Sequence, residues 1–171
     1  MMKQYLYKFL ILILVISSCE GFKEEVEPSE SYVADKPIII EYNGSELYVT
    51  PVDQSASISW GSDPSTTDAT SLTDGALNTQ RIVDSLGAGN YAAYICDTLS
   101  AYGYEDWYLP SKGELNALFQ HKDEIGTLEP YFYWSSTEAN QYRSWGQDFY
   151  DGVQDTTRKY HYEYVRCVRK E

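Results

Sequence analysis

The folded part of this chain must build its core largely from aromatic side chains. The sequence holds 17 tyrosines and 4 tryptophans, and few valine, leucine or isoleucine residues remain beyond its first eighteen positions. Tyrosine carries a polar hydroxyl and is only intermediate in its tendency to be buried. The composition therefore predicts a domain with an aromatic core and with some of its tyrosines at the surface.

Residues 1–18 have the pattern of a bacterial export signal. Lys3 and Lys8 supply positive charge, an apolar run covers residues 9–16, and two small serines precede Cys19. The apolar run is too short to cross a membrane, which takes about twenty residues. We expect a lipobox in which Cys19 becomes the lipidated N-terminus, and the alternative is an ordinary signal peptide with a chance cysteine. Several acyl chains on one residue give durable anchoring.

Residues 19–36 are predicted to form the lipidated cysteine and an acidic, disordered tether, because the segment is rich in glutamate and has no apolar periodicity. The Lys23-Glu24-Glu25 cluster resembles the acidic signal that sends some Gram-negative lipoproteins to the outer face of the cell, although a solvated spacer would look the same. We expect an outer membrane lipoprotein of a Gram-negative bacterium, exposed on the cell surface and held to the membrane by its N-terminal lipid only. Residues 37–171 are then the right size for one domain.

Three cysteines are an awkward number for an exported protein, but lipidation of Cys19 leaves only Cys96 and Cys167. In an oxidising compartment we expect these two to pair, which would close a long loop between a helix and the last strand and contribute about 4 kcal/mol. The alternative is a pair of buried free thiols that pack as small apolar side chains.

The first half of the domain predicts a hairpin, a loop and three helices. Residues 37–42 and 46–50 flank Asn43-Gly44, which is a strong two-residue turn signal. A loop is expected over the polar residues 62–73. Apolar residues at helical spacing predict helices over 78–86 and 91–102, the second capped by Asn90. The third helix is predicted to start after Ser111, which forms a capping box with Glu114.

The second half predicts strands over residues 131–136, 144–150 and 164–169, with a turn at Asp151-Gly152 and polar stretches between them. Because a strand lies near each end of the domain and helices lie between, we expect the ends to pair. The predicted fold class is α+β, with about three helices, antiparallel strands and termini close together.

An ordered set of short motifs runs through the domain. Its members are Val52-Asp53-Gln54-Ser55, Ser59-Trp60-Gly61, Asp74-Gly75, Asn78-Thr79, Ala92-Ala93, Cys96, residues 103–111, Glu114-Leu115, residues 133–138, Trp145, Phe149, Gly152 and residues 165–169. The order resembles the Lcl C-terminal-like family, the bacterial C-type-lectin-like domains at the C-terminus of collagen-like surface adhesins. The resemblance covers residues 38–169 and implies a C-type-lectin-like fold, related to variable proteins of diversity-generating retroelements. It supplies no ligand.

Most motif residues are expected to serve the structure. Core positions are expected for Trp107, Leu109, Trp134 and Phe149. Asp106 is expected to hydrogen-bond within its own turn, Glu114 to cap its helix, and the serines at 135–136 to bind nearby backbone. Because Arg166 and Arg169 are an odd number of positions apart, we expect one to face an internal carboxylate and the other to face solvent.

The predicted ligand-binding surface comes from residues 138–143 and 154–164, which are polar and aromatic and have no evident core duty. Tyrosine with asparagine and arginine gives large, rigid contacts and adaptable hydrogen bonds. In similar domains this stretch is the exposed face that varies. The alternative is a solvated hairpin surface. The candidate binding residues are Asn140, Tyr142, Arg143, Trp145, Gln147, Tyr150, Lys159, His161 and Tyr162.

The charge pattern disfavours polyanionic partners. The formal net charge is −13, and loss of Lys3 and Lys8 with the leader would lower it to −15. Residues 158–171 carry a local excess of positive charge, and some relatives bind sulfated glycosaminoglycans, but long-range repulsion opposes such binding here. No nucleic-acid partner is expected for the same reason.

Catalysis and metal binding find little support in the sequence. His121 and His161 are the two histidines, too few for a metal cluster of the usual spacing, and no nucleophile elbow, phosphate loop or dinucleotide fingerprint is present. Glu129-Pro130-Tyr131 lacks the third ligand of the calcium-dependent sugar site of animal C-type lectins. We expect no cofactor, no metal and no enzyme activity.

Two classes of function remain, with a third as an outlier. The first is an adhesin or receptor that binds an extracellular glycan or protein, and the alternative is an accessory subunit of a surface appendage or complex. The outlier is an oxidase, since formylglycine-generating enzymes share a related fold and use a cysteine pair. The sequence leaves the oligomeric state open.

Overall fold

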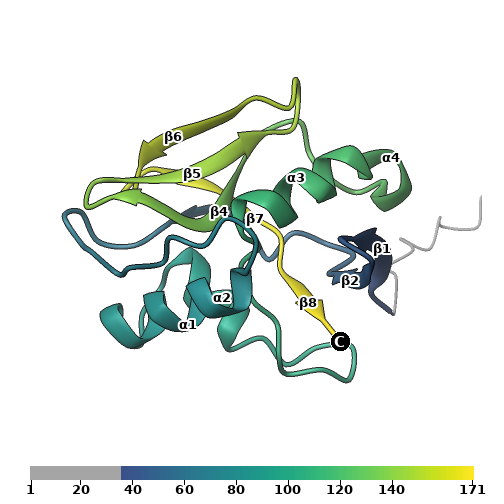
Figure 1. The fold of residues 1–171 in the computed structure, drawn as a ribbon, viewed down its shortest axis with the longest axis horizontal. Helices are drawn as coiled ribbons and strands as arrows, with labels where there is room; N and C mark the ends of the chain where they lie inside the picture. Colours follow the sequence, from purple (N-terminus) through teal and green to yellow (C-terminus); the bar gives the residue numbers. More distant parts are fainter. Residues whose placement is uncertain (1–35) are drawn as a thin grey trace, which may run out of the picture. The chain divides into compact units, whose positions relative to one another are not determined.

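The computed structural model describes residues 36–171, so the predicted signal peptide, Cys19 and most of the predicted tether lie outside the described residues. The described part is an α+β domain, as predicted (Figure 1). Its elements are β1 (Ile38–Tyr42), β2 (Ser45–Val49), β3 (Ser55–Ser59), α1 (Gly75–Leu86), α2 (Ala92–Asp97), α3 (Lys112–Gln120), α4 (Lys122–Ile125), β4 (Phe132–Asn140), β5 (Arg143–Asp148), β6 (Gln154–Arg158), β7 (Tyr162–Val165) and β8 (Val168–Lys170). Among these residues no helix is long and apolar enough to cross a membrane.

The smaller sheet joins the two ends of the domain in the order β1-β2-β8. The predicted hairpin is present, and its turn residues Asn43 and Gly44 have φ angles of 54° and 76°, which suits the twist of a two-residue hairpin. Strand β8 pairs antiparallel with β2 through Leu47 and Lys170. The predicted pairing of the domain ends is therefore confirmed.

The larger sheet has the strand order β3-β7-β4-β5-β6 and is antiparallel except where β4 meets β7. Three features of this sheet were not predicted, and the first is strand β3. The polar stretch after Gly152 forms β6, because β5 offers it a complete antiparallel ladder from Arg143 to Gln147. The single strand predicted over 164–169 is split, since β7 lies in the larger sheet and β8 in the smaller one.

The helices differ from the predictions mainly at their ends. Helix α1 starts at Gly75, because Asp74 caps it by accepting the Leu77 N–H at 2.9 Å. Helix α2 ends at Asp97 and has no side-chain cap, so the predicted extent to residue 102 and the predicted Asn90 cap were wrong. The chain turns instead at Tyr102, which has a positive φ angle of 58°.

The third helix was predicted well. Helix α3 carries the complete capping box of Ser111 and Glu114. Glu114 is fully buried and also accepts from the Gly75 N–H and the Tyr108 hydroxyl, so it joins two helices as well as capping one. The one-turn helix α4 was not predicted.

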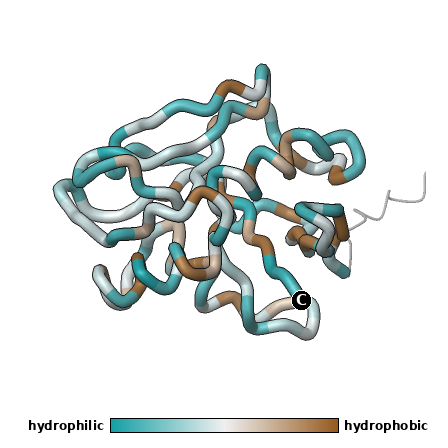
Figure 2. The backbone as a smooth tube through the Cα atoms, viewed as in Figure 1, coloured by the Kyte–Doolittle hydropathy of each residue, from teal (hydrophilic) through white to brown (hydrophobic). Residues whose placement is uncertain are grey.

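Aromatic side chains form a large part of the core, as the composition predicted, and they pack with an equally substantial set of buried aliphatic residues. Trp107, Leu109, Trp134 and Phe149 are all buried, together with Trp60 and Tyr133. The Trp60 indole N–H donates to the Ser135 carbonyl, and the Trp134 indole N–H donates to the Ile58 carbonyl, both at 2.9 Å. These bonds satisfy the polar ends of the two large rings within the core. Figure 2 shows hydrophobic positions around the helices and β1, whereas β6 is largely hydrophilic.

The prediction that only one of Arg166 and Arg169 would face a carboxylate was wrong. Both are buried, and their Nε atoms lie 2.8 Å and 2.7 Å from carboxylate oxygens of Asp53 and Asp106 respectively. Side-chain alternation along a strand does not apply to this pair, because the chain passes from the larger to the smaller sheet after Arg166 and the two arginines do not share a strand. Asp106 has a partner beyond its own turn as well, because it accepts from Arg169, and this hydrogen bond lowers the pKa of the Asp106 carboxyl.

A disulfide joins Cys96 in α2 to Cys167, which lies between β7 and β8. The predicted pairing is confirmed, and it ties the helices to the point where the chain passes between the sheets.

Removing this disulfide is expected to destabilise the domain strongly. The variant Cys96→Ala/Cys167→Ala should lose about 4 kcal/mol of unfolding free energy, because the bridge closes a loop of 71 residues. Urea denaturation of the oxidised protein, the reduced protein and the variant measures this. Reductant should not change the variant, and equal midpoints for all three samples would contradict a stabilising role.

Candidate binding surface

Two turns lie side by side at one end of the larger sheet, and the loop after β3 lies against them. The Lys159 N–H donates to the Tyr142 carbonyl at 3.1 Å, which joins the β6–β7 turn to the β4–β5 turn. The Ser65 N–H donates to the Gln141 carbonyl at 2.9 Å. Asn140 shapes its turn by accepting the N–H groups of Tyr142 and Arg143. We call residues 62–65, 140–143 and 158–162 the turn cluster.

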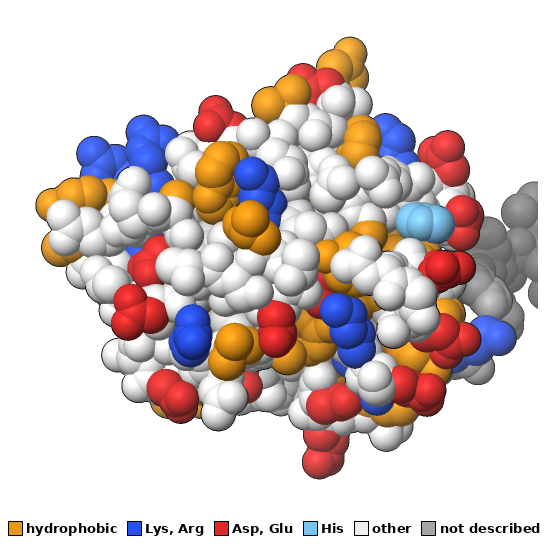
Figure 3. Space-filling model, viewed as in Figure 1, with side chains coloured by type: hydrophobic (Ala, Val, Ile, Leu, Met, Phe, Trp, Pro, Cys, Tyr) orange, Lys and Arg blue, Asp and Glu red, His pale blue; other side chains and the backbone are white. Residues whose placement is uncertain are grey.

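The outer surface of the turn cluster is aromatic and basic. Tyr142, Tyr160 and Tyr162 are 40%, 55% and 69% exposed. The Arg158 guanidinium lies over the Tyr142 ring at 5.3 Å, and the exposed Arg143 donates to the Thr156 carbonyl at 2.8 Å. In Figure 3 hydrophobic and basic side chains lie next to each other at the left end, where Figure 1 places the β4–β5 turn. Such a surface combines flat rings with fixed hydrogen-bond donors.

A buried ion pair lies beneath the turns. Lys159 is fully buried, and its Nζ contacts the Glu138 carboxylate and donates to the Ser65 carbonyl at 2.6 Å. The second Glu138 oxygen accepts the N–H groups of Thr67 and Asp68 at 3.0 Å and 3.1 Å. Burial lowers the pKa of Lys159, and Glu138 opposes that shift. The pair therefore fixes both turns and the 62–68 loop from inside.

The structure gathers six of the nine predicted binding residues in the turn cluster, and five of them are exposed there: Asn140, Tyr142, Arg143, His161 and Tyr162. The assignment of Lys159 and Gln147 to an exposed face was wrong. Lys159 holds the cluster from below, and Gln147 is buried, where its amide donates to Asn116 and to the Gly152 carbonyl.

The remaining two predicted residues lie outside the cluster. Trp145 is half-buried on β5 with the Lys112 amine 3.3 Å from its ring centre. Tyr150 is 78% exposed in the turn after β5, at the opposite end of that strand from Arg143. Arg158 and Tyr160 belong to the cluster and were not among the candidates. Arg158 lies opposite Arg143 in the ladder between β5 and β6, and strand alternation alone does not predict that register.

A carboxyl group with an unusual pKa borders the cluster. Glu163 follows Tyr162 on β7, and burial, with the nearby Asp148 charge, raises the pKa of its carboxyl to about 7. His161 lies beside it, with Nδ1 4.0 Å from a Glu163 oxygen and 2.9 Å from the Thr157 hydroxyl. Among residues 36–171 no three His, Cys, Asp or Glu side chains are grouped as a metal site.

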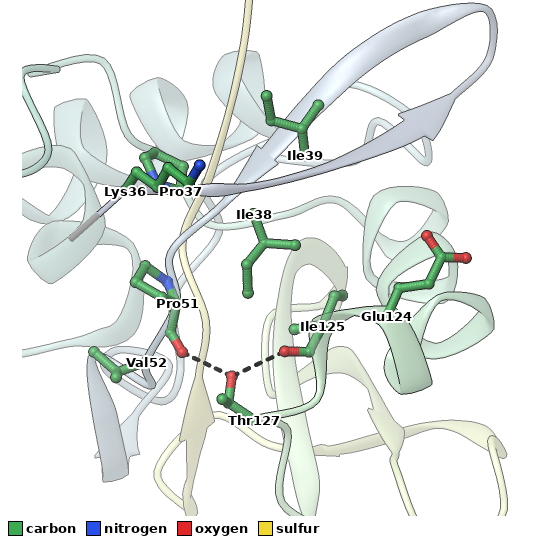
Figure 4. Close-up of a pocket in the computed structure, with 9 residues that line it drawn as sticks. All are labelled: Lys36, Pro37, Ile38, Ile39, Pro51, Val52, Glu124, Ile125 and Thr127. Carbon is green, nitrogen blue, oxygen red and sulfur yellow. Dashed lines mark hydrogen bonds between the residues drawn. The ribbon is translucent and has the colours of Figure 1, made fainter. Parts of the chain in front are cut away.

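A separate apolar cavity of about 510 Å³ lies near the start of the described chain (Figure 4). Pro37, Ile38, Pro51, Val52 and Ile125 supply most of its wall, and Lys36 and Glu124 supply its charged groups. The Thr127 hydroxyl donates to the Pro51 carbonyl, so the polar group at its floor is already satisfied. The cavity suits apolar contact and lacks the dense hydrogen-bonding groups of the turn cluster.

Together the paired domain ends, the two sheets and the intervening helices define a C-type-lectin-like domain. The sequence model of the Lcl C-terminal domain matches residues 49–169, and the chain belongs to that family. No curated protein matches the chain. The matched residues include the whole turn cluster and both cysteines of the disulfide.

Removing the buried lysine alone is expected to destabilise the domain. Lys159→Met leaves the Glu138 carboxylate buried without its counter-charge and should cost about 3–5 kcal/mol of unfolding free energy. The double variant Lys159→Met/Glu138→Gln should recover the part of this loss that comes from the unpaired carboxylate, because no buried charge remains. Urea denaturation of both variants provides the comparison.

The matched control is Arg81→Met, which removes an exposed cation that donates to the Asp68 carbonyl in the same loop. It should change stability by less than about 1 kcal/mol. A cost for Lys159→Met as small as that of the control would contradict the role given to the buried pair.

Glu163 is expected to make stability depend on pH in a defined direction. Its pKa in the folded protein, about 7, lies above the usual 4.5, so the folded state holds the proton more tightly. Its stabilising contribution is full below pH 4.5 and is lost as the pH rises to about 7. The unfolding midpoint of the natural protein minus that of Glu163→Gln should decrease between pH 4.5 and about pH 7 and stay constant above pH 7. A difference that does not vary with pH would contradict the raised pKa.

Proposed function

We propose that this protein is a cell-envelope lipoprotein whose C-type-lectin-like domain binds an extracellular glycan or protein through the turn cluster, without catalysis. The observation that carries the proposal is the combination of three exposed tyrosines with a buried ion pair that holds the turns beneath them. Binding then requires little ordering of the backbone.

The energetics of such a surface favour recognition. Tyrosine rings bury a large area and lose only two rotatable bonds on binding, so they give contact at low entropic cost. Association is also stronger when the binding segments are already held in their bound conformation. The turn cluster meets both conditions, because its backbone is joined across three chain segments and its exposed side chains are mainly aromatic or basic.

The proposed location draws on the sequence and on the disulfide. An export signal with a cysteine directly after it supports lipidation at Cys19. A disulfide between Cys96 and Cys167 suits a compartment outside the cytoplasm, where such bonds persist. Attachment at residue 19 would leave the domain free to meet ligands outside the membrane.

A second candidate function is an accessory subunit of a surface complex. It is favoured by exposed apolar side chains away from the turn cluster, where Tyr150 is 78% and Val153 is 55% exposed in the β5–β6 turn. Exposed apolar groups of this kind often lie in protein interfaces. The two candidates use different ends of the larger sheet and can be separated by substitution.

The test is binding of the purified protein to a glycan array and to a panel of envelope and host surface proteins, each with and without calcium. A ligand found in this way should bind without calcium. Tyr142→Ala, Arg143→Ala and Tyr162→Ala should each weaken its binding by about tenfold or more, as central aromatic and arginine contacts do. Their unfolding midpoints should stay close to that of the natural protein.

Tyr150→Ala is the matched control, since it removes an exposed tyrosine at the other end of β5. It should leave binding unchanged if the turn cluster is the site. Loss of binding in Tyr150→Ala, with no loss in the turn-cluster variants, would instead support the accessory-subunit function.

A further inference from the structure

The Lys159 and Glu138 side chains meet in a setting shielded from solvent. Their side chains are 0% and 4% exposed, and the Lys159 Nζ lies 4.5 Å from the centre of the buried Trp60 ring. The Ser65 carbonyl and hydroxyl also accept from Nζ. The amine is therefore held in one place against one carboxyl group, and side chains rather than bulk solvent surround both.

Hydrogen bonds hold the carboxyl group of Glu138 against the amine. The Lys159 Nζ contacts Glu138 Oε1, which is bonded to the carboxyl carbon Cδ. The Asp68 N–H donates to Oε2, and the Thr67 N–H donates to Oε2 and, at a slightly longer distance, to Oε1. Two backbone donors at this position would stabilise the negative charge that forms on Oε2 when a nucleophile adds to Cδ, as in an oxyanion hole.

Burial also changes which form of the pair is favoured. In water an ammonium and a carboxylate are well solvated, which opposes their condensation. In a buried site both ions lose that solvation, and the loss costs far more free energy for the two ions than for a neutral amide. Burial lowers the pKa of Lys159, so less free energy is needed to form the neutral, nucleophilic amine. Fixed neighbouring groups also react as though at very high concentration, on the order of 10⁵ M or more.

We propose that Lys159 and Glu138 condense to form an intramolecular isopeptide bond. The ammonium first gives a proton to Oε1, which leaves a neutral amine and a carboxylic acid. The nitrogen lone pair attacks Cδ and forms the Nζ–Cδ bond, and the Cδ–Oε1 bond breaks. Oε1 leaves as water with two of the three ammonium protons, and the third stays on the amide nitrogen. No oxidant, reductant or added reactant is needed.

The bond would act at the base of the turn cluster. It would join the end of β4 directly to the β6–β7 turn, which the structure otherwise connects there by hydrogen bonds and an ion pair. Together with the disulfide, it would give the domain a second covalent link, one that reducing agents do not break. The inference stands independently of which ligand the cluster binds.

Peptide mapping of the purified full-length protein tests this directly. After reduction and trypsin digestion, an isopeptide bond blocks cleavage after Lys159 and joins residues 123–143 to residues 159–166. The joined peptide should weigh one water less than its two parts. Recovery of residues 123–143 and 160–166 as separate peptides in full yield would overturn the proposal.

Two comparisons make the result specific. Lys159→Arg keeps a cation but supplies no nucleophilic amine, so its digest should contain no joined peptide. Lys170 also contacts a buried carboxylate, with Nζ 2.8 Å from Glu114, but its side chain is 32% exposed. That pair should remain unjoined, and a bond between Lys170 and Glu114 would overturn the argument that burial drives the condensation.

Discussion

The fold depends on a buried arginine at the point where the chain passes from one sheet to the other. Arg166 is fully enclosed, and its guanidinium binds the Asp53 carboxylate, the Thr50 carbonyl and both oxygens of Thr127. The planar fork of donors lets one side chain hold three chain segments at once. Cys167 follows directly, its carbonyl accepts the Thr50 N–H, and its sulfur is bonded to α2. This short segment therefore sets how the two sheets and the helices meet.

The same use of buried charge recurs under the turn cluster. Arg166 with Asp53, Lys159 with Glu138 and the Glu114 group each bring a charged side chain into the interior and satisfy it with several partners. Buried ions without partners would be strongly unfavourable, so each of these groups specifies one arrangement of the chain around it. These polar groups add directional contacts to a core that is built from both aromatic and aliphatic side chains.

Local signals predicted the elements that depend on neighbouring residues. The Asn43-Gly44 turn and the capping box at Ser111 were found because their chemistry lies within a few positions. Strand β6 and the division between β7 and β8 were missed, since both depend on pairing with other strands. β6 pairs with β5, whereas β7 and β8 pair with strands of different sheets. The turn cluster was found in part: its exposed tyrosines follow from composition, but the burial of Lys159 depends on Glu138, which is 21 residues away, and on the loop that carries Thr67.

The sequence alone therefore determined the class of fold, the presence of many aromatic side chains in the core, the cysteine pair and the segment of the chain that carries the exposed tyrosines. These follow from composition, local turn and cap chemistry, and the order of motifs. Only the tertiary structure decided which polar residues face solvent, because an ionisable side chain is buried when partners distant in the sequence satisfy it. That is why Lys159 and Arg169 lie inside the domain, while Tyr142, Tyr160 and Tyr162 form its surface.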